Sequence, residues 1–206
     1  MIETAFLITS FTTLLVVIDP PAQTPIFVAL TQGMDKSMRR AIAVRACLTA
    51  AGILAMFAAF GEAVLGFVGI SMEAFRVAGG VLLFLTALDM LFERRTKRRE
   101  NSAEEEEHPD PSVFPLGIPL IAGPGAIATM ILLAGQQPGI EGLAVVIGMM
   151  IIVVAMVFVT YLTSGAVARL LGKTGLNVLT RLLGMLLAAL SVQFILDGLK
   201  AFGFAS

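Results

Sequence analysis

Long apolar stretches separated by short polar segments run the whole length of the chain. A helix needs about 20 consecutive apolar residues to cross a bilayer, and six stretches are of about that length or longer. The pattern therefore predicts an all-α membrane protein with six transmembrane helices. Their expected bounds are residues 4–30, 41–68, 74–92, 114–134, 142–164 and 178–199.

The composition supports this class and excludes several functions. Hydrophobic residues make up 57% of the 206 positions and charged residues 14%, whereas soluble domains usually contain about 25% charged residues. The one cysteine, Cys47, has no second cysteine for an internal disulfide or a thiolate metal cluster. No basic face alternates with aromatic residues, so nucleic acid is not an expected partner. We predict a protein embedded in the lipid bilayer, with no metal and no cofactor.

One long hydrophilic segment divides the chain into two halves. Residues 93–112 contain the basic run RRTKRR at 94–99 and four consecutive glutamates at 104–107. Charge runs of this kind are usually solvated. We therefore expect a cytoplasmic linker between two three-helix units, residues 1–92 and 113–206, with a regulatory lid as the alternative.

The basic residues indicate the orientation, because loops rich in Lys and Arg stay on the cytoplasmic side. If the N-terminus is outside, the outer side carries only Arg76 and Lys200. We therefore expect both termini on the outer side of the membrane. The inner set consists of Lys36, Arg39, Arg40, the 94–99 cluster, Arg169 and Lys173.

The two halves contain similar motifs in the same order. LGFVG at 65–69 precedes RVAG at 76–79, and LGKTG at 171–175 precedes RLLG at 181–184. Further back, DPPA at 19–22 corresponds to GPGA at 123–126. Because each half has an odd number of spans, the second half must be inserted upside down relative to the first. This predicts two inverted 3+3 repeats, a common plan of secondary transporters.

The first and the fourth predicted helices are each interrupted near the middle. Proline removes a backbone donor and clashes with the preceding turn, so a helix should end near Asp19 and restart at Pro20. Gly123 and Pro124 should have the same effect in the fourth helix. In hydrocarbon, the freed backbone groups are tolerated only where protein or a water-filled cavity covers them. Paired breaks at corresponding positions therefore predict a transport site at the midplane.

The candidate substrate-binding residues are those of the two breaks. The first N–H groups of a helix have no partner within it and carry the positive end of the helix dipole. Two restarted helices could therefore receive an anionic group such as a carboxylate, and packing kinks without a ligand are the alternative. The candidates are Asp19, Pro20, Pro21, Ala22, Gln23, Thr24, Gly123, Pro124, Gly125 and Ala126.

Asp19 is the ionisable residue that the predicted spans place near the bilayer centre. A charge there costs at least about 2.5 kcal/mol, so such a residue usually faces a cavity. Aspartate is well suited to cap the restarted helix at its N-terminus. It could also pair with a substrate ammonium group or take up a coupling proton, and these roles are compatible.

Arg76 and Arg181 occupy matching places at the starts of the third and sixth spans, on opposite sides of the membrane. Their side chains are expected to extend to the lipid headgroups. The alternative is a gating role, in which they latch the outer and inner gates by pairing with carboxylates or helix ends. Asp89 and Asp197 lie toward the ends of the same spans and are expected at the membrane interface.

The motifs at the breaks and at the starts of spans three and six resemble the MarC family of bacterial and archaeal inner-membrane proteins. They are DP…PIF at 19–27, FRVAGG at 75–80, FPL…P…GPGA at 114–126 and RLLG at 181–184. The resemblance implies six membrane helices and a location in the inner membrane of the cell, so that the expected outer termini are periplasmic. It also implies membership of the superfamily that includes lysine exporters and transport of small neutral amino acids such as alanine, glycine, serine or threonine. Many relatives have a small residue shortly after the first Asp-Pro, where this chain has Pro21-Ala22-Gln23, and this leaves the substrate preference open.

The first hypothesis is therefore a secondary transporter, an exporter of small neutral amino acids coupled to a proton or another cation, and not an enzyme. The rival is a translocase or phosphatase of a polyprenyl phosphate lipid carrier, with Arg76 and Arg181 as phosphate ligands. A phosphatase needs a general acid or a nucleophile near the phosphate, but the one histidine, His108, lies in the linker. The sequence leaves open whether the chain forms a homo-oligomer.

A reporter that fluoresces only in the cytoplasm tests the orientation. Fused after Ser206, it should stay dark, because the distribution of basic residues predicts an outer C-terminus. Strong fluorescence from a properly inserted fusion would reverse the topology.

Overall fold

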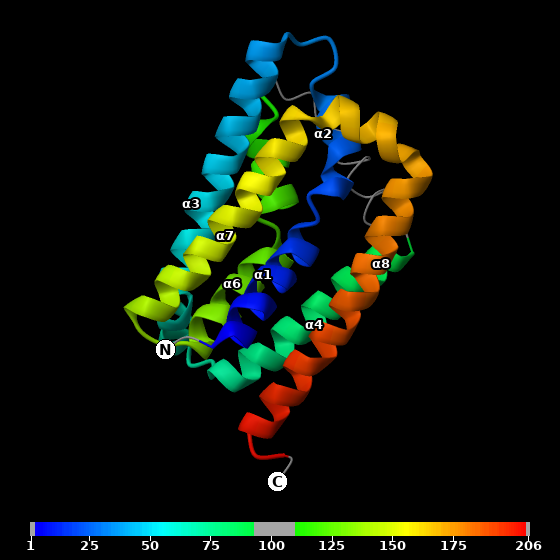
Figure 1. Cartoon of the computed structure of the whole chain (residues 1–206). Helices are drawn as coiled ribbons and strands as arrows, with labels where there is room; N and C mark the ends of the chain where they lie inside the picture. Colours follow the sequence, from blue (N-terminus) through cyan, green and yellow to red (C-terminus); the bar gives the residue numbers. More distant parts are fainter. Residues whose placement is uncertain (1–2, 93–109, 205–206) are drawn as a thin grey trace.

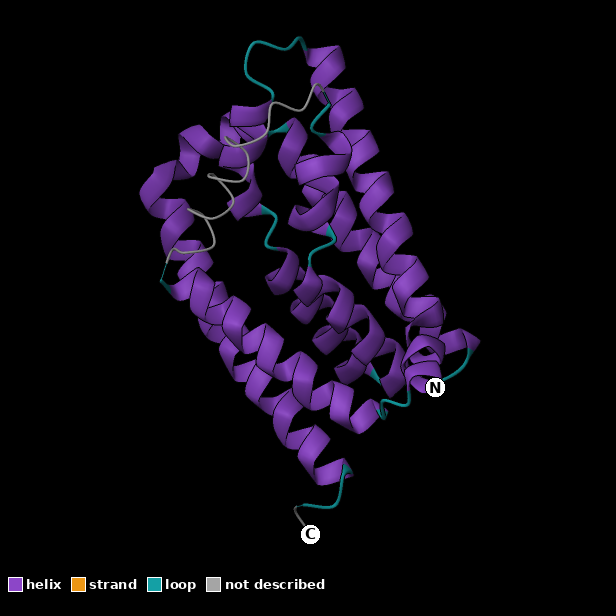
Figure 2. Cartoon of the chain, turned by 180° about the vertical axis from the view of Figure 1, so that it is seen from behind, coloured by secondary structure: helices purple, strands orange, loops and turns teal. Residues whose placement is uncertain are grey.

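The computed structural model describes residues 3–92 and 110–204 and shows a bundle of helices, with no strand in these two ranges (Figures 1 and 2). The predicted linker falls mostly on residues 93–109, outside the described residues. In chain order the elements are α1 (Thr4–Ile18), η1 (Pro21–Gln23), α2 (Thr24–Leu30), α3 (Lys36–Val68), α4 (Met72–Leu91), η2 (Ser112–Ile121), α6 (Pro124–Gln136), α7 (Ile140–Leu162) and α8 (Ser164–Ala201).

The membrane spans agree with the hydropathy pattern. Five helical segments in the described residues are long and apolar enough to cross a membrane, and the bent pair of η2 and α6 adds a sixth if it counts as one span. The first span, Thr4–Leu30, has the predicted bounds, and the others begin and end within a few residues of theirs. The all-α membrane class is confirmed.

Both predicted interruptions are present. One turn of 3-10 helix, η1, separates α1 from α2, and α6 is bent by 55° from η2. Within η2, Phe114 and Ile118 have extended dihedrals, because proline follows each and disfavours the helical region for the residue before it. Proline therefore shapes the fourth span over its whole first half.

Successive spans run in alternating directions, so each span of the first half is antiparallel to its counterpart in the second (Figure 1). Counterparts also touch: α4 packs along α8, α3 along α7, and α1 against α6. An inverted repeat requires this arrangement, and the repeat itself stays a prediction.

Small residues bring α4 and α8 close together. A Cβ built on Gly80 would lie 2.6 Å from Cγ1 of Ile195 and 2.9 Å from the backbone oxygen of Ser191. Gly198 makes a similar approach, 2.8 Å from Cγ2 of Val77. Since lipid removes the hydrophobic drive for helix association, such close packing is a main source of stability in a membrane. The pair forms a long antiparallel unit beside the broken helices (Figure 2).

The sixth span is only part of α8. Gly172 has φ 59° and ψ 178° and kinks the helix, and glycine accepts this positive φ without a steric penalty. The span itself is Thr174–Ala201, while the part before Gly172 bends across the end of the bundle that lies away from both termini (Figure 1).

Candidate functional site

Asp19 ends the first half of the broken first span. It has left-handed dihedrals, φ 54° and ψ 66°, which aspartate and asparagine tolerate better than most residues. Its N–H donates to the backbone oxygen of Leu15 at 2.9 Å, and the residue is fully buried. The expectation that Asp19 caps the restarted helix is wrong. The chain turns at Asp19, so that Pro20 precedes η1 and Gln23 precedes α2.

Gly123 and Pro124 form the second break as predicted, and α6 begins at Pro124. A Cβ on Gly123 would lie 2.6 Å from the backbone oxygen of Pro119, so the close approach of the two backbone segments requires glycine. The N–H of Ile127 donates to the oxygen of Gly123 at 3.0 Å. The N–H groups of Gly125 and Ala126 precede this bond and therefore have no acceptor within the helix.

Gln23 connects the two breaks. Its Nε2 donates to the backbone oxygen of Ile18 at 2.7 Å and to that of Leu120 at 3.4 Å. The hydroxyl of Tyr161, from α7, donates to Oε1 of Gln23 at 2.5 Å. All of these residues are buried. One side chain thus provides donors for carbonyl groups that the two interruptions release in the interior.

A cavity of about 300 Å³ lies beside the second break. Its wall contains residues 123–126, the four candidates of that break, together with Thr86 and Asp89 of α4. Val17, which precedes Ile18, and Leu120, which accepts a hydrogen bond from Gln23, also line it, but residues 19–24 lie outside this wall. The structure therefore brings the two breaks together and opens a cavity at the second.

The cavity offers groups of both charges to a ligand. The N-terminus of α6 provides backbone N–H groups and the positive end of a helix dipole, which favour an anion. Asp89 adds a carboxylate, which carries a negative charge, to the same wall. Among the described residues, no three His, Cys, Asp or Glu side chains lie close enough to hold a metal ion. The arrangement suits a small molecule that carries one positive and one negative group.

The two candidate gating arginines lie far apart. Near one end of the α4–α8 pair, Gly198 contacts Val77, and near the other end Gly184 contacts Met90. Arg76 and Arg181 are close to these opposite ends, and a rise of 1.5 Å per residue separates the ends by about 20 Å. Arg76 lines a second cavity, of about 520 Å³, together with Glu3 and Asp197, whereas Arg181 is exposed.

Sequence reasoning missed Asp89 and Tyr161. The expected position of Asp89 at the membrane interface stays a prediction, whereas its partly buried place in the cavity wall was not predicted. Asp89 follows Thr86 by three positions, so both polar side chains lie on one helix face. This spacing can be read from the sequence. No local pattern marks Tyr161, which meets Gln23 across 138 positions of sequence.

Replacing the connecting amide should destabilise the protein. Gln23→Leu removes the donor to Ile18 and Leu120 and leaves the Tyr161 hydroxyl without its acceptor. A buried polar group without a partner costs about 1–3 kcal/mol, so thermal unfolding in detergent should occur at a clearly lower temperature. Gln32→Leu, at an exposed position before α3, is the control and should have little effect. Equal unfolding temperatures for the two variants would contradict the connecting role.

Comparisons with known proteins cover nearly the whole chain. The family model described as MarC family integral membrane protein matches residues 4–202. A UPF0056 membrane protein of Archaeoglobus fulgidus is 36% identical over 95% of this chain and 92% of its own length. The UPF0056 membrane protein YvbG of Bacillus subtilis is 38% identical over 95% of both chains. The UPF0056 inner membrane protein YhgN of Escherichia coli K12 is 35% identical over 91% of this chain and 92% of its own. No solved structure matches. The chain belongs to the MarC family of integral membrane proteins.

Proposed function

We propose that this protein is a secondary transporter that exports small neutral amino acids, such as alanine, glycine, serine or threonine, across the inner membrane. The observation that carries the proposal is the cavity at the second break, whose wall contains both the N-terminus of α6 and Asp89. An amino acid carries a carboxylate and an ammonium group on one carbon atom. These two groups of the cavity wall match the two charges of an amino acid.

The carboxylate would accept hydrogen bonds from the N–H groups of Gly125 and Ala126, and the ammonium group would pair with Asp89. The hydroxyl of Thr86, in the same wall, already donates to the backbone oxygen of Leu82 at 2.9 Å and retains its capacity to accept. A volume of about 300 Å³ is at the small end of ligand cavities, which favours short side chains. Neutral side chains fit best, because the ammonium and carboxylate groups of the substrate already occupy Asp89 and the N–H groups of α6.

Alternating access would involve the two halves of the molecule. Asp89 belongs to the first half and α6 to the second, so the cavity lies where they meet. Transporters with broken helices often bind substrate between two such units and expose the site to one side at a time. Asp19, fully buried at the connected break, is the residue that we assign to the coupling proton. Both termini would face the outer side.

The lipid-carrier hypothesis is less favoured in the form that uses both arginines. A single phosphate group cannot contact Arg76 and Arg181 across about 20 Å. The lipid-carrier hypothesis also requires a general acid or a nucleophile beside the arginines, and no specific observation supports one. We therefore assign no catalytic role to this chain.

Flux into or out of proteoliposomes tests the substrate class. Labelled alanine, glycine, serine and threonine should cross the membrane of these vesicles faster than that of empty vesicles.

Asp89→Asn should weaken the apparent affinity for the transported amino acid about tenfold to a hundredfold, the value of a charge-assisted hydrogen bond. Gly125→Ala should also weaken it, because the new Cβ would lie 3.3 Å from Val17 and 3.5 Å from the Thr86 hydroxyl. Gly52→Ala, whose Cβ meets nothing within 4 Å, is the matched control. Absence of flux for all four amino acids would exclude the proposal.

Asp19→Asn separates proton coupling from structure. Asparagine tolerates the left-handed backbone of this position and has nearly the same shape, so the variant should remain folded in the membrane. It cannot carry a proton, and a proton gradient should therefore no longer drive accumulation. The measurement is uptake with and without an imposed pH difference. Wild-type, gradient-dependent transport in Asp19→Asn would assign the residue to structure alone.

A further inference from the structure

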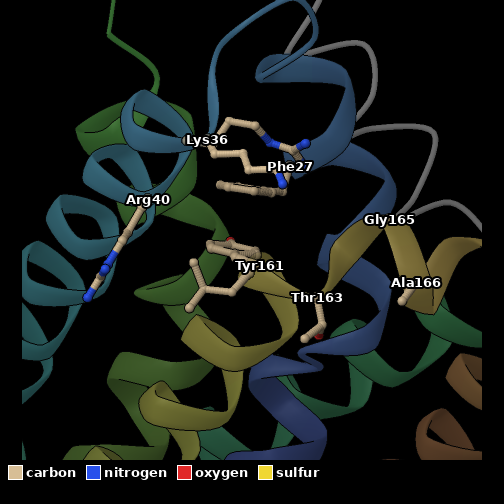
Figure 3. A pocket seen from close by; sticks show the side chains of 9 residues that line it. Phe27, Lys36, Arg40, Tyr161, Thr163, Gly165 and Ala166 are labelled. Carbon is tan, nitrogen blue, oxygen red and sulfur yellow. The ribbon is translucent and has the colours of Figure 1, made fainter.

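A third cavity, of about 570 Å³, opens at the end of the bundle that lies away from the termini. Four segments meet there: the end of the first span with Phe27, the start of α3 with Lys36, Arg39 and Arg40, the end of α7 with Tyr161, and the start of α8. Figure 3 shows Lys36 above the Phe27 ring and Tyr161 beneath it, while Arg40 extends away along α3. The cavity therefore has an aromatic floor with a cation above it.

Arg39 is held in place by neutral groups. Its Nη2 donates to Oγ of Ser164 at 3.0 Å, and its guanidinium carbon lies 5.6 Å from the centre of the Phe27 ring. Phe27 in turn stacks on Tyr161, with ring centres 4.2 Å apart and planes inclined by 6°. These contacts position the guanidinium group without neutralising its charge.

The positive charge of this cavity has no carboxylate in its wall. The ion pair between Arg45 and Asp110 does not involve the cavity. Asp35, beside Lys36 in sequence, uses its carboxylate to cap α3 by accepting the N–H of Met38 at 2.8 Å. Three basic side chains therefore border a space that is suited to an anion.

An apolar groove lies along the part of α7 that precedes the cavity residues. It has a volume of about 450 Å³ and is lined by Ile152, Ala155, Met156, Val159 and Thr160. The next residue on this helix face, three or four positions further on, is Thr163, which lines the basic cavity. From Ile152 to Thr163 a helix rises about 16 Å, close to half the hydrocarbon thickness of about 30 Å.

We propose that the basic cavity and this groove together bind an anionic phospholipid. The phosphate group sits with Lys36 and Arg39 over the Phe27 ring, and one acyl chain follows the groove on α7 toward the middle of the bilayer. Basic pockets between membrane helices bind anionic headgroups in this way. A free phosphate ion has the same headgroup chemistry but would leave the groove unused. The site is separate from the cavity at the second break, and its test does not depend on transport.

Binding can be measured by native mass spectrometry or by thermal unfolding of the full chain in zwitterionic detergent. Phosphatidylglycerol should bind saturably and raise the unfolding temperature, and phosphatidylcholine, whose headgroup carries no net charge, should do so much less. Lys36→Gln should weaken phosphatidylglycerol about tenfold, as expected for the loss of one charge-assisted contact, and Lys36→Gln combined with Arg39→Gln should weaken it further. Lys200→Gln, an exposed lysine at the other end of α8, is the matched control.

Two outcomes would overturn the proposal. Equal affinity of wild type and Lys36→Gln for phosphatidylglycerol would exclude the basic cavity as the headgroup site. Because Lys36 is exposed, this variant should fold even if the loss of the Arg39 contacts impairs the double variant. Inorganic phosphate that protects as strongly as phosphatidylglycerol at the same concentration would identify a free anion as the ligand. A loss of binding that is confined to the cavity variants, together with weak protection by inorganic phosphate, supports the lipid site.

Discussion

The structure depends on one constraint: a helix that breaks inside a membrane must find partners for the backbone groups that it releases, because hydrocarbon offers none. Here the carboxamide of Gln23 provides them for Ile18 in the first span and Leu120 in the fourth. A single side chain therefore joins the two interruptions and determines how closely α1 and η2 can lie. The position of the cavity beside residues 123–126 follows from this arrangement.

Local chemistry was sufficient to predict the spans and both breaks. Hydropathy places the helices, and Asp19-Pro20 and Gly123-Pro124 interrupt them, because these effects depend on a few neighbouring residues. The left-handed turn at Asp19 and the bond from Tyr161 to Gln23 could not be predicted, since they depend on how distant helices pack. The place of Asp89 in the cavity wall could not be predicted for a related reason: its distance from the end of a span says little about which helix covers it.

The cavity takes its two kinds of charge from different halves of the chain. Asp89 comes from α4 and the helix N-terminus from α6, while close packing through Gly80 and Gly198 holds α4 against α8. One wall therefore belongs to α4, which packs along α8, and the broken helices form the other. A shift of α4 and α8 against the broken helices would change the distance between the Asp89 carboxylate and the N–H groups at the start of α6. A bound zwitterion that contacts both groups would fix this distance.

Tyr161 takes part in two contacts at once: its ring stacks on Phe27 at the end of the bundle, and its hydroxyl reaches Gln23 at the connected breaks. The end of the molecule and its interior are consequently not mechanically independent. Any movement of α7 that separates the stacked rings also withdraws a donor from a buried amide oxygen. Entry of water into the cavity at Lys36 and Arg39 and loss of the Gln23 contacts between the two breaks should therefore occur in one concerted step, not in two successive ones.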